Sequence, residues 1–226
     1  AVAKARATWL PMGDGWDAAT YRERLHYRDE NGRFDAPLPR LPGAHQATNA
    51  ALAFAMLRHQ NVIPVHESAL KAAPLWAHWP ARLQRLDAGP LVDRLPAGST
   101  VWLDGGHNAG AGEAIGAFFT PERLGGERLQ LVIGMLANKD VEDFLNPLAG
   151  KIAHIHALPV PGHDHHAPDR FGAVAAQWGI DCTPHASVPD ALAAIATIVG
   201  QPSQVLIAGS LYLAGDALRL NDQYPD

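Results

Sequence analysis

Short apolar runs alternate with amphipathic stretches along the chain from about residue 100 onward. Residues 101–103, 129–136, 151–160 and 204–210 are nearly continuous apolar segments, and each is followed by a loop and then by residues with helical spacing. Strands that are apolar throughout are typical of parallel sheets buried on both faces. The pattern therefore predicts an α/β fold, with a Rossmann-like, mostly parallel sheet and helices on both faces.

The first part of the chain has a different pattern. Residues 16–35 alternate apolar and polar side chains and contain Asn31-Gly32, a dipeptide suited to a tight turn, so we predict two short antiparallel strands. Three prolines then follow between residues 36 and 43, which predicts an extended connector without helix.

A helix is predicted over residues 44–60, because alanine is abundant there and apolar residues recur at helical spacing. The predicted apolar stripe consists of Ala50, Ala53, Phe54 and Leu57. His45 and Asn49 are four residues apart and so share a face of this helix. Residues 62–80 contain three prolines and predict a loop that holds a domain boundary.

Composition and charge narrow the function classes. The 226 residues are 47% hydrophobic, which suffices for a sizeable core, and the formal charge of -5 argues against nucleic acid and anionic membrane surfaces as partners. The single cysteine, Cys182, fits a reducing cytoplasm, and no apolar run of about 18 residues is present. The first residue is not Met, and we expect the chain to begin inside a longer protein.

Residues 100–119 join an apolar strand, a glycine-rich loop and a helix. Asp104, His107 and Asn108 lie in this loop, whose glycines would allow close approach of the backbone to an anion near the helix N-terminus. Such junctions also occur in α/β domains without any ligand. Because parallel strands place their carboxyl ends at one edge, the topology predicts that a set of polar and loop residues gathers there: Asp104, His107, Met135, Lys139, Pro161 and Ser210.

Three other kinds of site have weaker support. The dinucleotide-binding glycine pattern fails because Ile115 stands where its third glycine is needed, and no Walker phosphate loop occurs in these residues. The histidines at 163–166, with His154 and His156 upstream, suggest either a metal site or a solvated loop. Ser210 could act with His107 and Asp104 in a hydrolase, but it lacks the flanking glycines of a nucleophile elbow.

Five segments, taken in order, resemble the folylpolyglutamate synthase/dihydrofolate synthase family of the Mur ligase superfamily, in its C-terminal portion. The segments are LPGAHQATNAALA (41–53), WPARLQRL (79–86), VWLDGGHNAGA (101–111), LVIGMLANKD (131–140) and VLIAGSLYLAGD (205–216). The resemblance implies that residues 1–75 are the end of an ATPase domain, a hairpin plus the HQxxN helix. Residues 76–82 would be a linker and residues 83–226 the glutamate-ligase domain.

The resemblance also implies a reaction. The family activates a carboxylate of dihydropteroate or of a reduced folate with ATP, and the acyl phosphate is attacked by the amine of L-glutamate. It implies ATP and Mg²⁺ as cofactors, with the Mg²⁺ ligands mostly in a preceding domain, so that this chain alone would be inactive. Whether one or both folate activities are present stays open, as does the oligomeric state, a monomer included.

Residue roles follow from the matched motifs. His45, Gln46 and Asn49 match residues on the adenine side of the nucleotide, Arg82 matches an arginine that reaches the ATP phosphates, and Asp104 matches an aspartate near the ribose or the metal shell. His107, Asn108 and Ser210 are the candidates for holding glutamate. Arg82, Asp104 and His107 are the candidate catalytic residues. The resemblance gives Lys139 no role and assigns no metal ligand to this chain.

Two departures from the family pattern concern the same region. Gly106 replaces the usual alanine, an exchange that should be mild, and Ala81 replaces the glycine that usually precedes the arginine, which calls the turn geometry at Arg82 into question. Two other functions remain as alternatives: a Mur-type ligase acting on a cell-wall precursor, and a non-catalytic nucleotide-binding module.

Overall fold

The computed structural model describes residues 9–223. The chain divides into two compact units, Ala1–Trp79 and Pro80–Asp226. The division falls within residues 76–82, the stretch that the sequence indicates as a linker. Each unit has its own hydrophobic core, and the two are described in turn.

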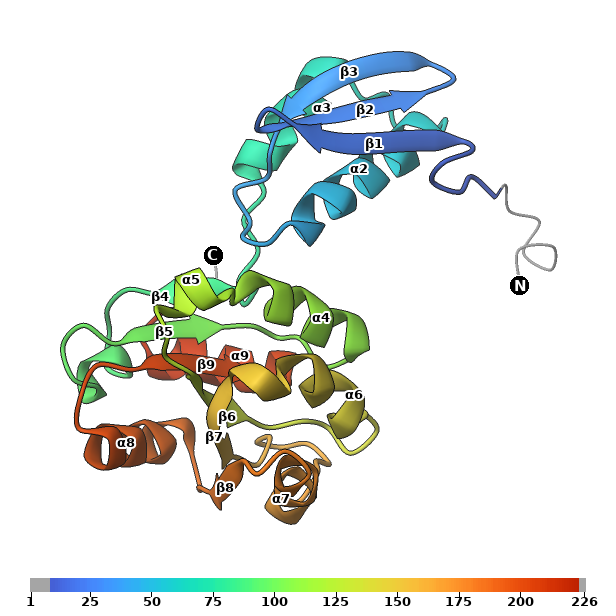
Figure 1. Cartoon of the computed structure of the whole chain (residues 1–226). Helices are drawn as coiled ribbons and strands as arrows, with labels where there is room; N and C mark the ends of the chain where they lie inside the picture. Colours follow the sequence, from blue (N-terminus) through green and yellow to red (C-terminus); the bar gives the residue numbers. More distant parts are fainter. Residues whose placement is uncertain (1–8, 224–226) are drawn as a thin grey trace. The chain divides into compact units, whose positions relative to one another are not determined.

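The first unit is a three-stranded antiparallel sheet with two helices (Figure 1). The strands are β1 (Trp16–Tyr21), β2 (Arg24–Asp29) and β3 (Gly32–Pro37), and the helices are α2 (His45–Arg58) and α3 (Glu67–Trp76). One face of the sheet and one face of α2 form the core, in which Tyr27, Phe34 and Phe54 pack ring against ring.

The prediction of two strands in residues 16–35 was wrong, because there are three. The extra turn joins β1 to β2 at Arg22-Glu23, where φ is 48° and 57°. A two-residue hairpin with positive φ normally takes Asn or Gly, so Arg-Glu gives no turn signal in the sequence. The predicted turn at Asn31-Gly32 lies at the junction of β2 and β3.

The helix at residues 44–60 is confirmed, but its buried face is not the predicted one. The buried apolar residues of α2 are Ala47, Ala51, Phe54 and Ala55, whereas Leu57 is 37% exposed. Alanine on every side of the helix leaves the apolar face poorly defined in sequence. The predicted loop at 62–80 is also wrong in part: the ten-residue helix α3 begins after Pro64 and contains Pro74 near its end.

A buried ion pair fastens the end of α2 to the end of β2. The Asp29 side chain is fully buried and takes two hydrogen bonds from Arg58, 2.6 Å from Nε and 2.8 Å from Nη2. The Tyr27 hydroxyl also donates to Asp29 at 3.1 Å. The hydrogen bonds from Arg58 hold the pKa of Asp29 below its usual value. Both partners are thereby satisfied within the core.

Replacing Arg58 should therefore destabilise the first unit. We expect Arg58→Met to lower the free energy of unfolding by about 3–5 kcal/mol, because it leaves a buried carboxylate without its cation. The matched control is Arg28→Met, which removes an exposed pair with Asp17 at 2.8 Å and should cost less than about 1 kcal/mol. Urea unfolding of both variants measures the difference. Equal losses in the two would contradict the role given to Arg58.

The second unit is built on a six-stranded sheet in the order β4-β5-β9-β6-β7-β8. The strands are β4 (Gln84–Leu86), β5 (Thr100–Leu103), β6 (Leu129–Ile133), β7 (Ile152–Ala157), β8 (Asp181–Pro184) and β9 (Gln204–Ala208). All neighbours are parallel except β4, which pairs antiparallel with β5. The predicted α/β class with a mostly parallel sheet is confirmed. The edge strand β8 was not predicted, because Asp-Cys-Thr-Pro is not an apolar run.

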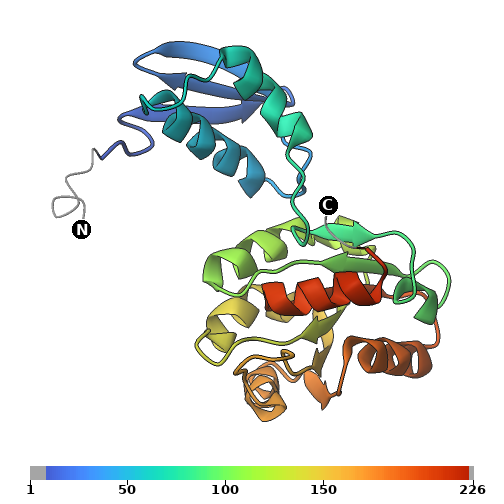
Figure 2. The same ribbon diagram turned by 180° about the vertical axis from the view of Figure 1, so that it is seen from behind.

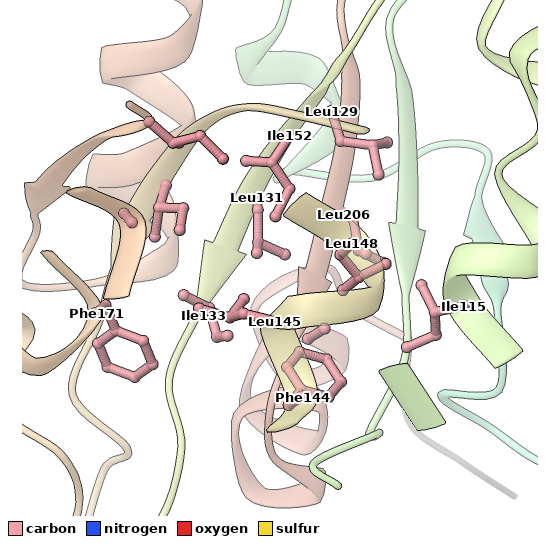
Figure 3. Close-up of a cluster of buried hydrophobic side chains, with 14 of the residues drawn as sticks. Ile115, Leu129, Leu131, Ile133, Phe144, Leu145, Leu148, Ile152, Phe171 and Leu206 are labelled. Carbon is pink, nitrogen blue, oxygen red and sulfur yellow. The ribbon is translucent and has the colours of Figure 1, made fainter. Parts of the chain in front are cut away.

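Helices cover both faces of this sheet (Figures 1 and 2). The helices are α4 (Ala109–Phe118), α5 (Pro121–Leu124), α6 (Val141–Leu145), α7 (Pro168–Ala176), α8 (Val188–Val199) and α9 (Leu211–Leu220), with 3₁₀ turns η1 (Val92–Arg94) and η2 (Asn146–Lys151). Helices α4, α6 and α7 share one core with the sheet, whereas α8 and α9 share the core of the opposite face. Figure 3 shows the first core, where side chains of β6 and β7 meet Phe144, Leu145 and Leu148.

The two neighbouring strands β5 and β9 send the chain to opposite faces. After β5 the chain enters α4 on one face, and after β9 it enters α9 on the other. Loops that leave adjacent parallel strands in opposite directions open a crevice between them, where ligands of open α/β sheets bind. The topology therefore places the candidate site between residues 104–108 and 209–210.

Candidate functional site

Three loops meet at the carboxyl edge of the sheet, as the topology predicts. The Gly209 amide donates to the Gly106 carbonyl at 2.9 Å, which joins the β9 loop to the β5 loop. The Gly134 amide, after β6, donates to Ala208 at 3.4 Å. Gly209 has φ +102°, a conformation that L side chains rarely adopt, and a Cβ there would lie 2.8 Å from the Gly134 carbonyl. The sequence from Ala208 to Ser210 is thus fixed between two neighbouring loops.

Asp104 organises this edge. Its side chain is only 6% exposed, and its two carboxylate oxygens accept hydrogen bonds from backbone amides, Leu83 N at 2.8 Å and Gly106 N at 2.6 Å. Hydrogen bonds to a carboxylate are stronger than those between neutral groups. Asp104 therefore ties the segment before β4 to the loop after β5.

The segment that Asp104 holds is strained. Ala81 and Leu83 are both buried and have φ of 55° and 45°, in the left-handed region. A non-glycine residue in this region costs about 1–2 kcal/mol. Two more bonds keep the turn in place: the Ala81 amide donates to Gln84 Oε1, and the Gly105 amide donates to the Ala81 carbonyl, each at 2.9 Å. Position 81, where the resemblance leads us to expect a glycine, is thus left-handed with an alanine in it.

Arg82 lies between these two strained residues. Its side chain is half-buried, and Nη1 donates to the Ala81 carbonyl at 3.2 Å. A Cβ on Gly105 would lie 3.3 Å from Arg82 Nη1, so the guanidinium passes close to the β5 loop. The turn therefore brings a permanent cation to the loop after β5, at the edge that faces the crevice.

The other predicted residues of this edge have definite local partners. His107 Nδ1 lies 2.8 Å from the Gly105 carbonyl, which can only accept, so Nδ1 carries a proton, and in the uncharged tautomer Nε2 is an acceptor. Asn108 is the N-cap of α4 and accepts from Ala111 N at 3.0 Å. Ser210, only 2% exposed, is the N-cap of α9 and accepts from Tyr212 N at 3.1 Å. Asn108 and Ser210 thus begin helices at the crevice.

Most glycines of the β5 loop and α4 serve packing. A Cβ on Gly112 would clash with the Phe144 carbonyl, and one on Gly116 would lie 2.8 Å from the Pro147 carbonyl, so both glycines let α4 approach α6 and η2. At Gly106 an alanine methyl would lie 2.7 Å from Ala111 Cβ and 2.9 Å from Asp104 Oδ1. Glycine in place of alanine at position 106, an exchange that we expected to be mild, therefore lets Ala111 and Asp104 pack more closely than an alanine would allow.

His45, Gln46 and Asn49 lie in the other unit, at the start of α2. Asn49 Nδ2 donates to Gln46 Oε1 at 3.1 Å. Both residues line a mainly apolar cleft of about 230 Å³ between α2 and α3. The apolar wall includes all four residues of the predicted stripe, Ala50, Ala53, Phe54 and Leu57. Phe54 is also buried in the core, so the stripe lies partly in the core and partly along the cleft wall.

The histidine-rich loop at 163–166 also lies at the carboxyl edge, which sequence reasoning did not foresee. The His166 amide donates to Met135 O at 3.0 Å and its ring contacts the Lys139 carbonyl at 2.7 Å, while His163 stacks on Tyr212 with centroids 3.6 Å apart. Within residues 9–223, no group of three or more His, Cys, Asp and Glu side chains is placed to hold a metal ion. The loop is thus held by backbone bonds and ring contacts.

Known proteins with similar sequence are folate enzymes. No model of a known protein family matches the chain. Folylpolyglutamate synthase of Lacticaseibacillus casei is 29% identical over 204 residues, covering 85% of this chain and 42% of that protein. Dihydrofolate synthase/folylpolyglutamate synthase of Bacillus subtilis is 28% identical over 204 residues, covering 86% and 43%. The chain therefore spans less than half the length of the curated relatives it matches.

Solved structures agree with the fold. E. coli FolC in complex with DHPP and ADP has a TM-score of 0.75 at 24% identity, over 98% of this chain and 49% of that one. A bifunctional folylpolyglutamate synthase/dihydrofolate synthase with Mn, AMPPNP and L-glutamate has a TM-score of 0.68 at 19% identity, over 96% and 48%.

The mixed, mostly parallel six-stranded sheet with its helices has the fold found in these structures. Relatives and structures together identify folylpolyglutamate synthase/dihydrofolate synthase homologues along nearly the whole chain. The predicted resemblance is confirmed. None of the helices in the described part of the chain is long and apolar enough to cross a membrane.

Asp104 should contribute to stability through its two backbone bonds. Asp104→Asn keeps the shape but turns one acceptor into an amide donor that faces a buried N–H, so we expect a loss of about 1–3 kcal/mol in the free energy of unfolding. Asp140→Asn is the matched control, because Asp140 also accepts from two backbone amides but is exposed at the N-cap of α6, where Asn serves nearly as well. Urea unfolding compares them. A neutral Asp104→Asn would show that the carboxylate does not hold the turn.

Proposed function

We propose that this chain is the C-terminal part of an ATP-dependent amide ligase that adds L-glutamate to dihydropteroate, to a reduced folate, or to both. The observation that carries the proposal is the convergence of Arg82, His107 and Ser210 on the loops at the β5/β9 crevice. The identity of the relatives supports the substrate class. The E. coli structure with DHPP and ADP, and the structure with AMPPNP and L-glutamate, support the ligand kinds.

The chemistry requires a cation, a base for the amine and a place for carboxylates. A carboxylate is a poor electrophile, so phosphorylation supplies a leaving group, and the transferring phosphoryl group needs neutralisation. Arg82 supplies a forked, permanent cation for the phosphates. The free lone pair of His107 Nε2 suits a hydrogen bond from the glutamate ammonium. Amides at the starts of α4 and α9, capped by Asn108 and Ser210, suit the carboxylates of glutamate.

The first unit fits the nucleotide side of the reaction. We assign residues 1–75 to the end of an ATPase domain, residues 76–82 to a linker and residues 83–226 to the glutamate-ligase domain. The apolar cleft beside Gln46 and Asn49 suits a flat base with polar edges, so we assign the adenine to it, with His45 at the start of the same helix. For Asp104 we keep the role that the resemblance implies, near the ribose or the metal shell. ATP with Mg²⁺ is the expected cofactor, Mn being present in one related structure. A cytoplasmic location fits folate chemistry.

An assay of the longer protein that contains this chain tests the proposal. Purified protein with ATP and L-glutamate should consume ATP and form an amide when dihydropteroate or tetrahydrofolate is the acceptor. Turnover only with a cell-wall nucleotide precursor as the acceptor would assign it to the Mur-type ligases. Nucleotide binding without turnover on any acceptor would instead favour a binding module. The 226-residue chain alone should be inactive.

Arg82 gives the sharpest kinetic prediction for the longer protein. Arg82→Ala should lower kcat about 10²–10³-fold, because one cation at the transferring phosphoryl group is lost. Arg82→Lys should recover part of this activity, since it keeps the charge but not the fork. Arg85→Ala is the control, because Arg85 is exposed and pairs with Asp87 at 3.0 Å. Near-normal kcat in Arg82→Ala, with folded protein, would remove Arg82 from the site.

A further inference from the structure

Three histidines that the proposed function does not use lie in contact near one edge of the second unit. We call His154, His156 and His185 the imidazole array. The first two are on β7, and His185 directly follows β8. The ring centroids are 4.6 Å apart for His154 and His156 and 5.1 Å apart for His156 and His185. The array is on the sheet face that α8 covers, because His156 pairs in register with Val132 of that core.

His156 is bonded at both ring nitrogens. It is 1% exposed, with Nε2 lying 3.1 Å from Gln130 Oε1 and Nδ1 lying 2.9 Å from His185 Nε2. Because the Gln130 oxygen can only accept, His156 Nε2 carries the proton and Nδ1 is left as an acceptor. His185 Nε2 must then donate to it. The tautomers of both rings are therefore fixed by their partners.

This arrangement limits how many protons the pair can hold. A proton added to His185 Nδ1 leaves both hydrogen bonds intact. A second proton, on His156 Nδ1, would place two N–H groups against each other across 2.9 Å. The folded pair can thus take up one proton and resists a second, whereas both rings can be protonated freely when they are exposed to water.

The array fastens an edge strand. Among the described strands, β8 pairs only with β7, and its other sheet edge is open. Two side-chain links join β8 and the residue after it to β7: the His154 ring contacts Thr183 Oγ1 at 2.9 Å, and the His185 ring contacts His156. On the opposite face β8 packs against α7. Loss of the side-chain links would leave β8 with four residues of backbone pairing and one helix contact.

Charged groups around the array act in both directions. Asp181 of β8 favours the charged form of His154, and Asp190 of α8 favours that of His185. Burial opposes both and is the larger effect, so the pKa values of His154 and His185 are lowered. Burial, with the neighbouring His154 and His185, lowers the pKa of His156 to about 3. Folded β7 and β8 therefore exclude protons that the opened segment would bind.

We propose that the imidazole array makes the attachment of β8 dependent on pH, holding the strand on the sheet while its rings are neutral and releasing it on acidification. Groups with a lowered folded pKa stabilise the fold above their unfolded value, which for histidine is about 6.5, and this contribution is lost as pH falls below that value. The release should thus begin below about pH 6.5. The inference does not depend on the proposed ligase activity.

Native-state hydrogen exchange of the 226-residue chain tests this. Protection factors of the β8 amides, Asp181 to Thr183, should give an opening constant that rises about 10-fold per pH unit for each proton taken up between pH 6 and 5. The NMR signals of His156 should remain those of a neutral ring over this range. A β8 opening constant that is unchanged from pH 7 to 5, or a folded His156 that titrates near pH 6.5, would overturn the inference.

Two variants distinguish proton uptake from a purely structural role. His156→Gln can still accept from His185 through its amide oxygen and donate to Gln130 through its amide nitrogen but cannot be protonated, so the pH slope of β8 opening should fall by about one proton, a tenfold smaller change per pH unit. His154→Gln, at a half-buried position, serves the same purpose if the first variant does not fold. His66→Gln is the control, because His66 is exposed before α3 and its side chain caps nothing. Unchanged slopes in both array variants would refute the role of the imidazoles.

Discussion

The candidate site depends on one carboxylate and the two backbone amides that it accepts from. Asp104 accepts from the amides of Leu83, 21 residues away in sequence, and Gly106, two residues away. Together with the Ala81 amide bond to Gln84, these bonds hold Ala81 and Leu83 in the left-handed region, although neither is glycine. The turn that carries Arg82 is therefore a consequence of β5 pairing with β4, and the position of the cation is set by the sheet.

The topology explains why polar residues can lie together beside the apolar core of the second unit. Because α4 and α9 leave the sheet on opposite faces, the loops between Asp104 and Asn108 and before Ser210 are not covered by a shared helix. Both helices begin with a capping side chain at this point, so both helix N-termini lie at the crevice. A structural need, the capping of helices, and a chemical need, the binding of anions, are met by the same residues. Mutating Asn108 or Ser210 will therefore affect both.

The apolar periodicity and the topology predicted the sheet and the convergence of the strand ends. The elements that they did not predict are those that depend on contacts between residues far apart in the sequence. The apolar runs of β6 and β9 are recognisable because burial on both faces dictates their composition. Strand β8 and the Arg22-Glu23 turn depend on partners that no local pattern reveals. Likewise, the aspartate after β5 was predicted to face nucleotide, but its bond to Leu83 could not be, because that contact spans 21 residues and a left-handed turn.

The buried polar side chains of this chain have different hydrogen-bond partners, and only some of these partners can gain or lose a proton near neutral pH. Asp29 accepts from the permanent cation of Arg58, and Asp104 accepts from backbone amides, neither of which titrates near neutral pH. The Asp29 arrangement stays intact until the carboxylate itself is protonated, and the hydrogen bonds from Arg58 hold the pKa of Asp29 below its usual value. His156 instead accepts from a second imidazole through Nδ1, and a proton on that nitrogen would remove the acceptor of the bond. The proposed pH sensitivity thus lies at the sheet edge formed by β7 and β8.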